Sequence, residues 1–342
     1  MRSNRCQRFL RAAASALIRI LIALALGYAE MALIAYFHPG EGQEEGIVPA
    51  LAKAFEGGLI PLLRGGTDGF LAECAKTAPA ALIAVGVAFA WRAGLYQLGG
   101  AGQYALGAAA CAACFTFFSW PWYACILVST AVGALTGTLA GWLKSRFRTH
   151  EGLSTLIIGW IGVYGASAAC QCFDAGKADF SAIELPMAVL PTVIALILWL
   201  GMILTYAGWA HSTRGAGESI ARYAGMNVGK TVVWTMTVSA ALAGCAGGAA
   251  YCLGLEAGAP GIGAALSGVG VQGLAAGMLA NGNPIGAVIA AGLTAQIANG
   301  AVQMDAAVFS PEVGEAILAQ MLYLCAAGML LRGKLAKGGR SR

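Results

Sequence analysis

Two glutamines, Gln97 and Gln103, lie within a glycine-rich stretch of an otherwise apolar sequence. A primary amide carries donors and an acceptor, so a pair of amides can bind a polar, uncharged solute without breaking any bond in it. Four glycines within residues 94–102 disfavour a continuous helix. The stretch predicts either a broken helix that presents both glutamines and Tyr104 to a solute, or a polar loop.

A second polar interruption reads Asn281-Gly282-Asn283-Pro284 and joins two apolar segments without a charged residue between them. Asn-Gly and Asn-Pro pairs favour tight turns. The short segment before the turn carries Gln272. The pattern leaves two interpretations open. One is a half-helix that presents Gln272, Asn281 and Asn283 to a solute, and the other is an ordinary turn between helices.

A third stretch, between two later apolar runs, fits one short, capped helix. We expect this helix at Ala216–Ala224, with Gly215 as the N-cap and Gly225 at the C′ position that favours glycine. Glu218 would lie in the first turn, and Arg222 follows four residues later, in the order that stabilises a helix. The helix would serve as a docking surface for a soluble partner, or as a connector.

Residue patterns typical of enzymes and metal sites do not occur in the sequence. It contains no H-E-x-x-H, no G-x-S-x-G and no nucleotide-binding G-x-x-x-x-G-K-[ST]. Cys111-x-x-Cys114 has the spacing of half a zinc site without a second half, and the three histidines lie far apart. The ten cysteines are expected to be small packing residues. We expect no catalytic residue, no metal and no cofactor in this chain.

The composition indicates a membrane protein. Of 342 residues, 58% are hydrophobic and only 11% are charged, and the mean hydropathy is +0.72. Soluble domains carry about 25% charged residues. The 49 glycines suit close helix packing in lipid. We therefore expect an all-α, polytopic membrane protein whose surroundings are a lipid bilayer and that binds no nucleic acid.

Apolar runs near the length that crosses a bilayer recur along the chain. They predict about ten helical segments, some of them broken, and residues 48–63 add an amphipathic helix on the membrane surface. The expected segments are 12–37, 77–91, 104–118, 122–143, 153–172, 187–207, 231–255, 269–280, 284–302 and 313–331.

The placement of basic residues sets the expected orientation. With both termini in the cytoplasm, the outward-facing Lys and Arg are only four of the 21, namely Lys53, Arg64, Lys76 and Lys177. Residues 1–342 are then expected to form one transmembrane domain. Its parts outside the spans are a basic cytoplasmic tail (1–11), an external loop (38–76), a cytoplasmic loop (208–230) and a second basic cytoplasmic tail (332–342).

Between residues 79 and 331, four motifs in order resemble the permeases of ABC importers for nucleosides and simple sugars, within the branched-chain amino acid/ribose permease superfamily. Residues 96–103 resemble F-N-I-G-x-E-G-Q, with Gln97 in place of Asn and Ala101 in place of the acidic residue. Residues 151–155, Glu-Gly-Leu-Ser-Thr, resemble E-x-x-S-T. Residues 270–275 with Asn283-Pro284 resemble G-F-D-G-I-A and N-x-P, with Gln272 in place of Asp.

The fourth motif is a coupling segment that in the family reads G-x-N-P-x-A-A-x-Y-A-G. Gly217 and Glu218 stand where Asn-Pro is usual. The resemblance implies that this helix docks on an ATPase and that Gln97, Gln103, Tyr104, Gln272, Asn281 and Asn283 line the substrate pathway. The coupling residues that it implies are Gly215, Glu218, Ala221, Arg222, Tyr223 and Gly225.

The resemblance also implies a location in a bacterial cytoplasmic (inner) membrane, and it implies the other parts of the transporter. Two cytoplasmic ABC ATPase subunits would hold ATP and Mg²⁺, a second permease would complete a homo- or heterodimer, and an extracytoplasmic binding protein would deliver the substrate. Because Ala101 and Gln272 replace family carboxylates, the substrate stays open between nucleosides and simple sugars.

One alternative is an ion-coupled secondary transporter of small polar solutes. Such proteins usually carry a carboxylate or histidine inside a span. Glu30 and Glu256 are the only candidates for that position in this sequence.

Overall fold

The computed structural model describes residues 2–37, 46–64, 70–172, 183–255, 268–305, 308–310, 312–321 and 323–324, and these ranges are helical without strands. Eight of the described helices are long and apolar enough to cross a membrane. The expected all-α membrane fold is confirmed. The count of about ten segments stays a prediction, because much of the expected segment 313–331 lies outside the described residues.

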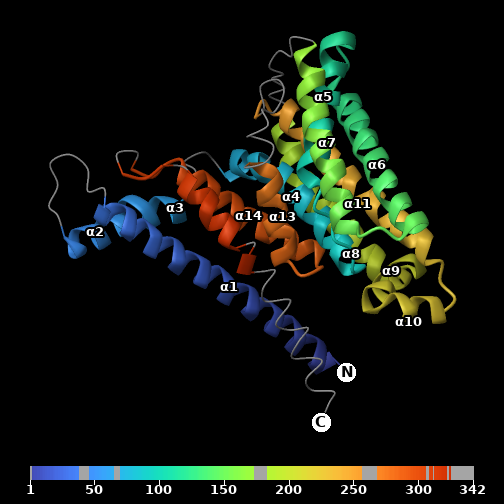
Figure 1. The fold of residues 1–342 in the computed structure, drawn as a ribbon, viewed down its shortest axis with the longest axis horizontal. Helices are drawn as coiled ribbons and strands as arrows, with labels where there is room; N and C mark the ends of the chain where they lie inside the picture. The colour runs from blue at the N-terminus through green and yellow to red at the C-terminus, as the bar shows by residue number, and fades with distance from the viewer. Residues whose placement is uncertain are drawn as a thin grey trace. The chain divides into compact units, whose positions relative to one another are not determined.

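The chain divides into two compact units, a larger one of residues 68–292 and a smaller one of residues 1–67 and 293–342. The larger unit holds the predicted polar interruptions (Figure 1). Its helices are α4 (Phe70–Arg92), α5 (Gly100–Phe118), α6 (Trp122–Phe147), α7 (Glu151–Gln171), α8 (Glu184–Leu204), α9 (Tyr206–Ala216), α10 (Glu218–Tyr223), α11 (Val228–Cys252), α13 (Val269–Leu279) and the beginning of α14 (Pro284–Ala301).

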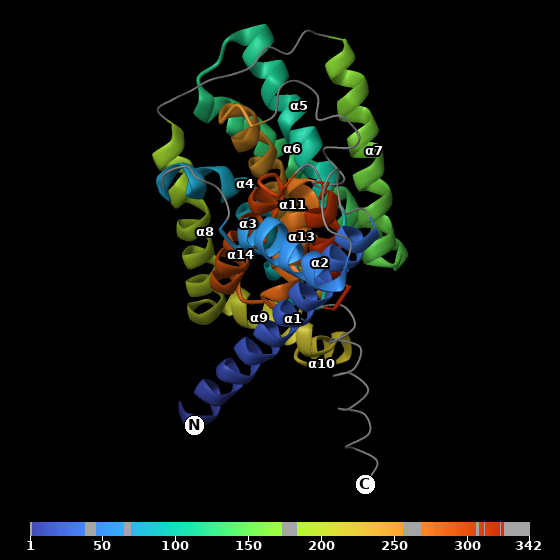
Figure 2. The ribbon, with the colours of Figure 1, turned by 90° about the vertical axis from the view of Figure 1, so that its left-hand side faces the viewer.

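Two helices form the centre of the larger unit. Burial covers 78% of the apolar window of α4 and 72% of that of α11, against 22% for α8. α11 packs along α4, α5 and α6, and α4 also packs against α8 and α13 (Figures 1 and 2). The outward faces of α6, α7 and α8 carry exposed large apolar side chains, as expected of helices that face lipid.

Small residues allow α6 to lie close to α11. A Cβ at Gly137 would press on the carbonyl of Met236, and one at Gly141 would lie 2.7 Å from the Cα of Val233. Gly133, Gly137 and Gly141 recur every four residues and so share one helical face, a spacing that predicts close approach of another helix, and this close packing is confirmed.

Several predicted boundaries need correction. α4 begins at Phe70, so the last part of the expected external loop 38–76 is helical, with Glu73 in the first turn, where the helix dipole favours an acid. The expected N-terminal tail 1–11 is helical from Arg2 onward.

The smaller unit comprises α1 (Arg2–Phe37), α2 (Ile47–Lys53), a π-helical turn (Ala54–Leu59), α3 (Ile60–Arg64), the end of α14 and a helical segment over residues 312–321. The expected helix 48–63 is thus present, with a π turn in its middle. Within this unit Glu30 accepts a hydrogen bond from Gln320 Nε2. Glu256, the other candidate for an intramembrane acid, lies outside the described residues.

Candidate substrate and coupling sites

The connection between α4 and α5, residues 93–99, brings the two predicted glutamines together. Gln97 Nε2 donates to Gln103 Oε1 over 2.7 Å, and the two side chains are 3% and 1% exposed. Gln103 lies in the first turn of α5, where its N–H donates to the carbonyl of Gly99. The predicted interruption of the helix is present, and two of the six expected solute-contacting residues meet there.

This amide pair leaves one acceptor and one donor unused. Gln97 Oε1 and Gln103 Nε2 are buried without a hydrogen-bond partner in the described part of the chain. One N–H···O bond between two amides uses one NH₂ group and one oxygen, so the other oxygen and the other NH₂ group stay unpaired. This holds for either orientation of the two amides. A buried unpaired polar group costs about 1–3 kcal/mol. A solute with a donor beside an acceptor would satisfy both groups at once.

The glycines of this stretch bring α5 close to α7. A Cβ at Gly99 would collide with the carbonyl of Thr155, and one at Gly102 would collide with the carbonyl of Gly159. The Leu98 N–H donates to Thr155 Oγ1 over 3.3 Å. These glycines therefore make room for a neighbouring helix.

The Asn-Gly-Asn-Pro stretch forms a capped turn between α13 and α14. Asn281 and Gly282 have φ values of 51° and 79°. Asn283 Oδ1 accepts the N–H of Ile285 over 3.2 Å, which caps the first turn of α14. A Cβ at Gly282 would lie 3.3 Å from the Cα of Arg92, so the turn lies beside the end of α4.

The two remaining expected pathway residues, Tyr104 and Gln272, differ in burial. Tyr104 is fully buried on α5, and its carbonyl faces Gly247 of α11. Gln272 is half-buried on α13.

The stretch between α8 and α11 forms two helices, α9 and α10, instead of one. Gly217, with φ 156°, is the N-cap of α10. The predicted N-cap Gly215 is wrong, because that residue lies inside α9, where a Cβ would collide with the carbonyl of Arg92. Gly225 has φ 75°, which confirms the predicted left-handed residue after the helix.

α10 presents most of its side chains to solvent. Tyr223 is 99% exposed and Ile220 is 55% exposed, whereas Ala221 is buried. Arg222 Nη2 donates to Glu218 Oε1 over 2.7 Å, which confirms the expected pair. This hydrogen bond lowers the pKa of Glu218, against a smaller opposing effect of burial.

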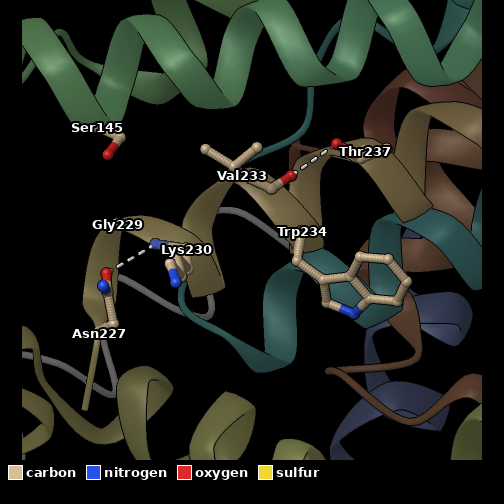
Figure 3. A pocket seen from close by; sticks show the side chains of 7 residues that line it. All are labelled: Ser145, Asn227, Gly229, Lys230, Val233, Trp234 and Thr237. Atoms are coloured by element: carbon tan, nitrogen blue, oxygen red, sulfur yellow. Dashed lines mark hydrogen bonds between the residues drawn. The ribbon is translucent and has the colours of Figure 1, made fainter.

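A hollow of about 520 Å³ lies beside the start of α11, across from the end of α6 (Figure 3). Ser145 faces it from α6, and Lys230 and Trp234 face it from α11. Asn227 Oδ1 accepts the backbone N–H of Lys230 over 3.1 Å and caps α11. A second, more polar hollow of about 470 Å³ adjoins α10 and is lined by Lys144, Ser145, Arg148, Glu218, Arg222, Val228, Gly229 and Val232.

Two polar residues that sequence reasoning did not select, His211 and Arg214, are 3% and 7% exposed on α9. Their spacing of three residues places them on one face of a helix. The signal was present in the sequence, but it depended on placing α9 as a helix, and we had expected only α10 there.

The family model described as branched-chain amino acid transport system/permease component matches residues 71–326. The guanosine ABC transporter permease protein NupP of Bacillus subtilis (strain 168) is 28% identical over 290 residues, which cover 76% of this chain and 82% of NupP.

The nucleoside ABC transporter permease protein NupB of Lactococcus lactis subsp. cremoris (strain MG1363) is 23% identical over 363 residues, covering 93% of this chain and 92% of NupB. A solved inward-facing metal-chelate type ABC transporter aligns with 92% of this chain and 98% of its own, at a TM-score of 0.42 and 16% identity. The family match covers most of the chain. This chain therefore belongs to the branched-chain amino acid transport system/permease component family, as the membrane-spanning permease subunit of an ABC importer in which a separate subunit hydrolyses ATP.

Proposed function

We propose that this permease imports nucleosides across the bacterial cytoplasmic membrane. Two ATPase subunits would drive the import, and one of them would dock on α10 of this chain. The relatives NupP and NupB are named for guanosine and nucleoside transport, which supports a nucleoside as substrate. In this proposal ATP and Mg²⁺ are held by the ATPases, a second permease completes the dimer, and an extracytoplasmic binding protein delivers the nucleoside.

The observation that carries the coupling role is the exposure of α10. A six-residue helix that buries only Ala221 and leaves Tyr223 almost fully exposed contributes little to its own fold. Aromatic and arginine side chains dominate the binding energy of protein interfaces. Tyr223 is the proposed anchor, Arg222 with Glu218 the proposed polar rim, and the left-handed Gly225 sets the angle at which the helix is presented.

The amide pair supports a nucleoside over a simple sugar. A nucleobase edge places a carbonyl acceptor next to a ring N–H donor, which matches the free donor of Gln103 and the free acceptor of Gln97. Sugar hydroxyls could occupy the same groups, but each hydroxyl both donates and accepts, so they require no such fixed pair. In this proposal Gln97 and Gln103 contact the substrate during passage, while Tyr104, Gln272, Asn281 and Asn283 line neighbouring parts of the route.

Uptake into proteoliposomes that contain the complete complex tests this proposal. We expect ATP-dependent uptake of radiolabelled guanosine that persists in the presence of a protonophore, with leucine and ribose taken up at background levels. Guanosine uptake that ignores ATP and collapses with the protonophore would instead indicate the ion-coupled transporter. ATP-driven uptake of ribose or leucine, without uptake of guanosine, would agree with an ABC importer but contradict a nucleoside as the substrate.

The proposed orientation has both termini in the cytoplasm and residues 38–76 outside. Single cysteines at Glu44 and Lys337, in a cysteine-free background, test it in intact spheroplasts with an impermeant maleimide. We expect labelling at Glu44 only. Equal labelling of both positions would contradict the orientation.

A further inference from the structure

α4 ends at a glycine in the left-handed conformation. The hydrogen bonds at this helix end leave some backbone carbonyls able to accept from other elements. Gly94 has φ 68°, the Leu95 N–H donates to the carbonyl of Ala90 over 3.1 Å, and the Gly94 N–H donates to that of Trp91 over 2.8 Å. This is the Schellman arrangement. The carbonyls of Phe89, Ala93 and Gly94 take their partners from α9.

His211 supplies the first of these partners. Its Nε2 lies 2.8 Å from the carbonyl oxygen of Phe89, and its ring stacks on the Phe89 ring at 4.2 Å between centroids. Because a carbonyl can only accept, Nε2 carries the proton and Nδ1 faces the Thr235 hydroxyl of α11 at 3.1 Å. Burial lowers the pKa of His211 to about 4, so the ring is neutral at pH 7.

Arg214 supplies the second partner. Its Nη1 donates to the carbonyls of Ala93 and Gly94, the latter over 3.3 Å, and the side chain is buried. In the described part of the chain no carboxylate forms a salt bridge with it. Its charge therefore lies against the negative end of the α4 dipole, an arrangement that favours a cation. Arg92 Nε of α4 donates back to Ser212 Oγ of α9 over 3.1 Å.

We call the contacts of residues 89–94 with residues 211–215 the α4–α9 joint. Gly215 closes it, because any side chain there would collide with the carbonyl of Arg92. On one side of the joint, one residue separates α9 from α10, and the buried Ala221 of α10 shares an apolar cluster with Ala90, Ala93 and Leu95. On the other side, the backbone continues from Leu95 directly to Gln97.

We propose that Arg214 and His211 are positioning residues that make α10, α9 and the end of α4 move as one body, so that a displacement of α10 by an ATPase is delivered to the Gln97–Gln103 pair. The proposal rests on the docking role given to α10 above. Arg214 suits this task because its hydrogen bonds are made to backbone carbonyls at the end of α4, so they do not depend on which side chains α4 carries. The cluster around Ala221 keeps α10 from rotating independently.

The first test uses Arg214→Met, Arg214→Lys and His211→Gln in the reconstituted complex. The matched control is Thr213→Ala on the same helix, whose hydroxyl bonds the carbonyl of Trp209 within α9. We expect the variants of the joint to retain co-purifying ATPase and basal hydrolysis. Stimulation by loaded binding protein should fall about tenfold in Arg214→Met, a size typical of coupling between sites, and less in Arg214→Lys. Wild-type stimulation per assembled complex in Arg214→Met would overturn the proposal.

The second test does not depend on these variants folding. Spin labels on cysteines introduced at Thr213 of α9 and at Tyr96, just after α4, report the joint in a cysteine-free complex that keeps Arg214 and His211, and labels at Thr213 and Leu139 of α6 report whether α9 moves. Between nucleotide-free and ATP-trapped states, we expect the Thr213–Leu139 distance to change and the Thr213–Tyr96 distance to stay fixed. A change in the second distance as large as in the first, or no change in either, would overturn the proposal.

Failure of the underlying docking role is distinguishable from failure of the joint. If Tyr223→Ala leaves ATPase association intact, α10 is not the docking surface. If Tyr223→Ala weakens association but Arg214→Met keeps full stimulation, the docking role stands and the joint has no part in transmission.

Discussion

Two glycine-rich interruptions of the larger unit use glycine for opposite reasons. At the start of α5, Gly99 has φ −86°, an ordinary value, and what excludes a side chain there is the carbonyl of Thr155. At the ends of α10, Gly217 and Gly225 have φ 156° and 75°, and a Cβ at Gly225 would meet nothing within 4 Å. The first interruption needs glycine for space, and the second needs it for backbone conformation.

This difference separates a buried region from an exposed one. The α4–α5 connection is packed against α7 and hides its two amides, whereas α10 exposes Tyr223 and Arg222. Substitutions in the first region should therefore act through packing and through buried polar groups. Those in the second should act through strain and docking, with small effects on the stability of the isolated permease.

The largest effect is expected for Gly102→Ala. Its Cβ would overlap the backbone of Gly159, which cannot move aside as a flexible side chain can. Overpacking costs about 1–3 kcal/mol, and a backbone clash falls at the upper end. Thermal unfolding in detergent measures it. The control is Gly165→Ala on α7, where nothing lies within 4 Å of the new Cβ. Equal melting temperatures for the two variants would show that Gly102 is not required to make room for the backbone of Gly159.

The next effect concerns the amide pair. Gln103→Leu strands the amide of Gln97 and should cost about 1–3 kcal/mol of stability, whereas Gln97→Leu combined with Gln103→Leu should be close to neutral. If the amides contact substrate, both variants should lose guanosine uptake. Normal uptake by the stable double variant would show that the pair is structural only.

A smaller effect is expected for Gly225. Forcing a side chain into the left-handed region costs about 1–2 kcal/mol, and valine is less tolerant there than asparagine. Gly225→Val should reduce ligand-stimulated ATP hydrolysis, and Gly225→Asn should largely restore it. If the two variants behave alike, the backbone conformation at Gly225 is not what positions α10.

The smallest effect is expected for Arg222→Ala. The Glu218–Arg222 pair is exposed, and such i, i+4 pairs contribute about 0.2–0.5 kcal/mol to helix stability. The melting temperature of the isolated permease should therefore hardly change, while ATPase affinity falls. A large drop in melting temperature would place Arg222 in the fold and not in the interface.

Local rules predicted the parts of the fold that local chemistry decides. The apolar runs predicted the spans, the glycine repeat on α6 predicted close packing on another helix, and the Glu218–Arg222 spacing with Gly225 predicted α10. Each of these depends on residues within a few turns of one another, or on a composition that is uniform over a whole helix.

Contacts between distant segments could not be predicted in the same way. Gly215 reads as a cap in the sequence, but the carbonyl of Arg92, more than 100 residues earlier in the chain, is the reason for it. Gly99 and Gly102 likewise predict the break between α4 and α5, but nothing in the local sequence indicates that α7 packs against them. His211 and Arg214 were missed because no helix was expected over residues 206–216, and because their partners on α4 are backbone carbonyls, which any residue type supplies.

In the proposed mechanism α10 couples ATP hydrolysis on a partner to movement in this permease, and the substitution Tyr223→Ala is the sharpest test of this coupling. ATP hydrolysis by the reconstituted complex should be measured with and without loaded binding protein. We predict normal membrane insertion, normal ligand capture by the binding protein, weakened ATPase association and loss of the stimulated rate. If the binding protein stimulates ATP hydrolysis fully in Tyr223→Ala, at wild-type ATPase stoichiometry, α10 is not the coupling helix.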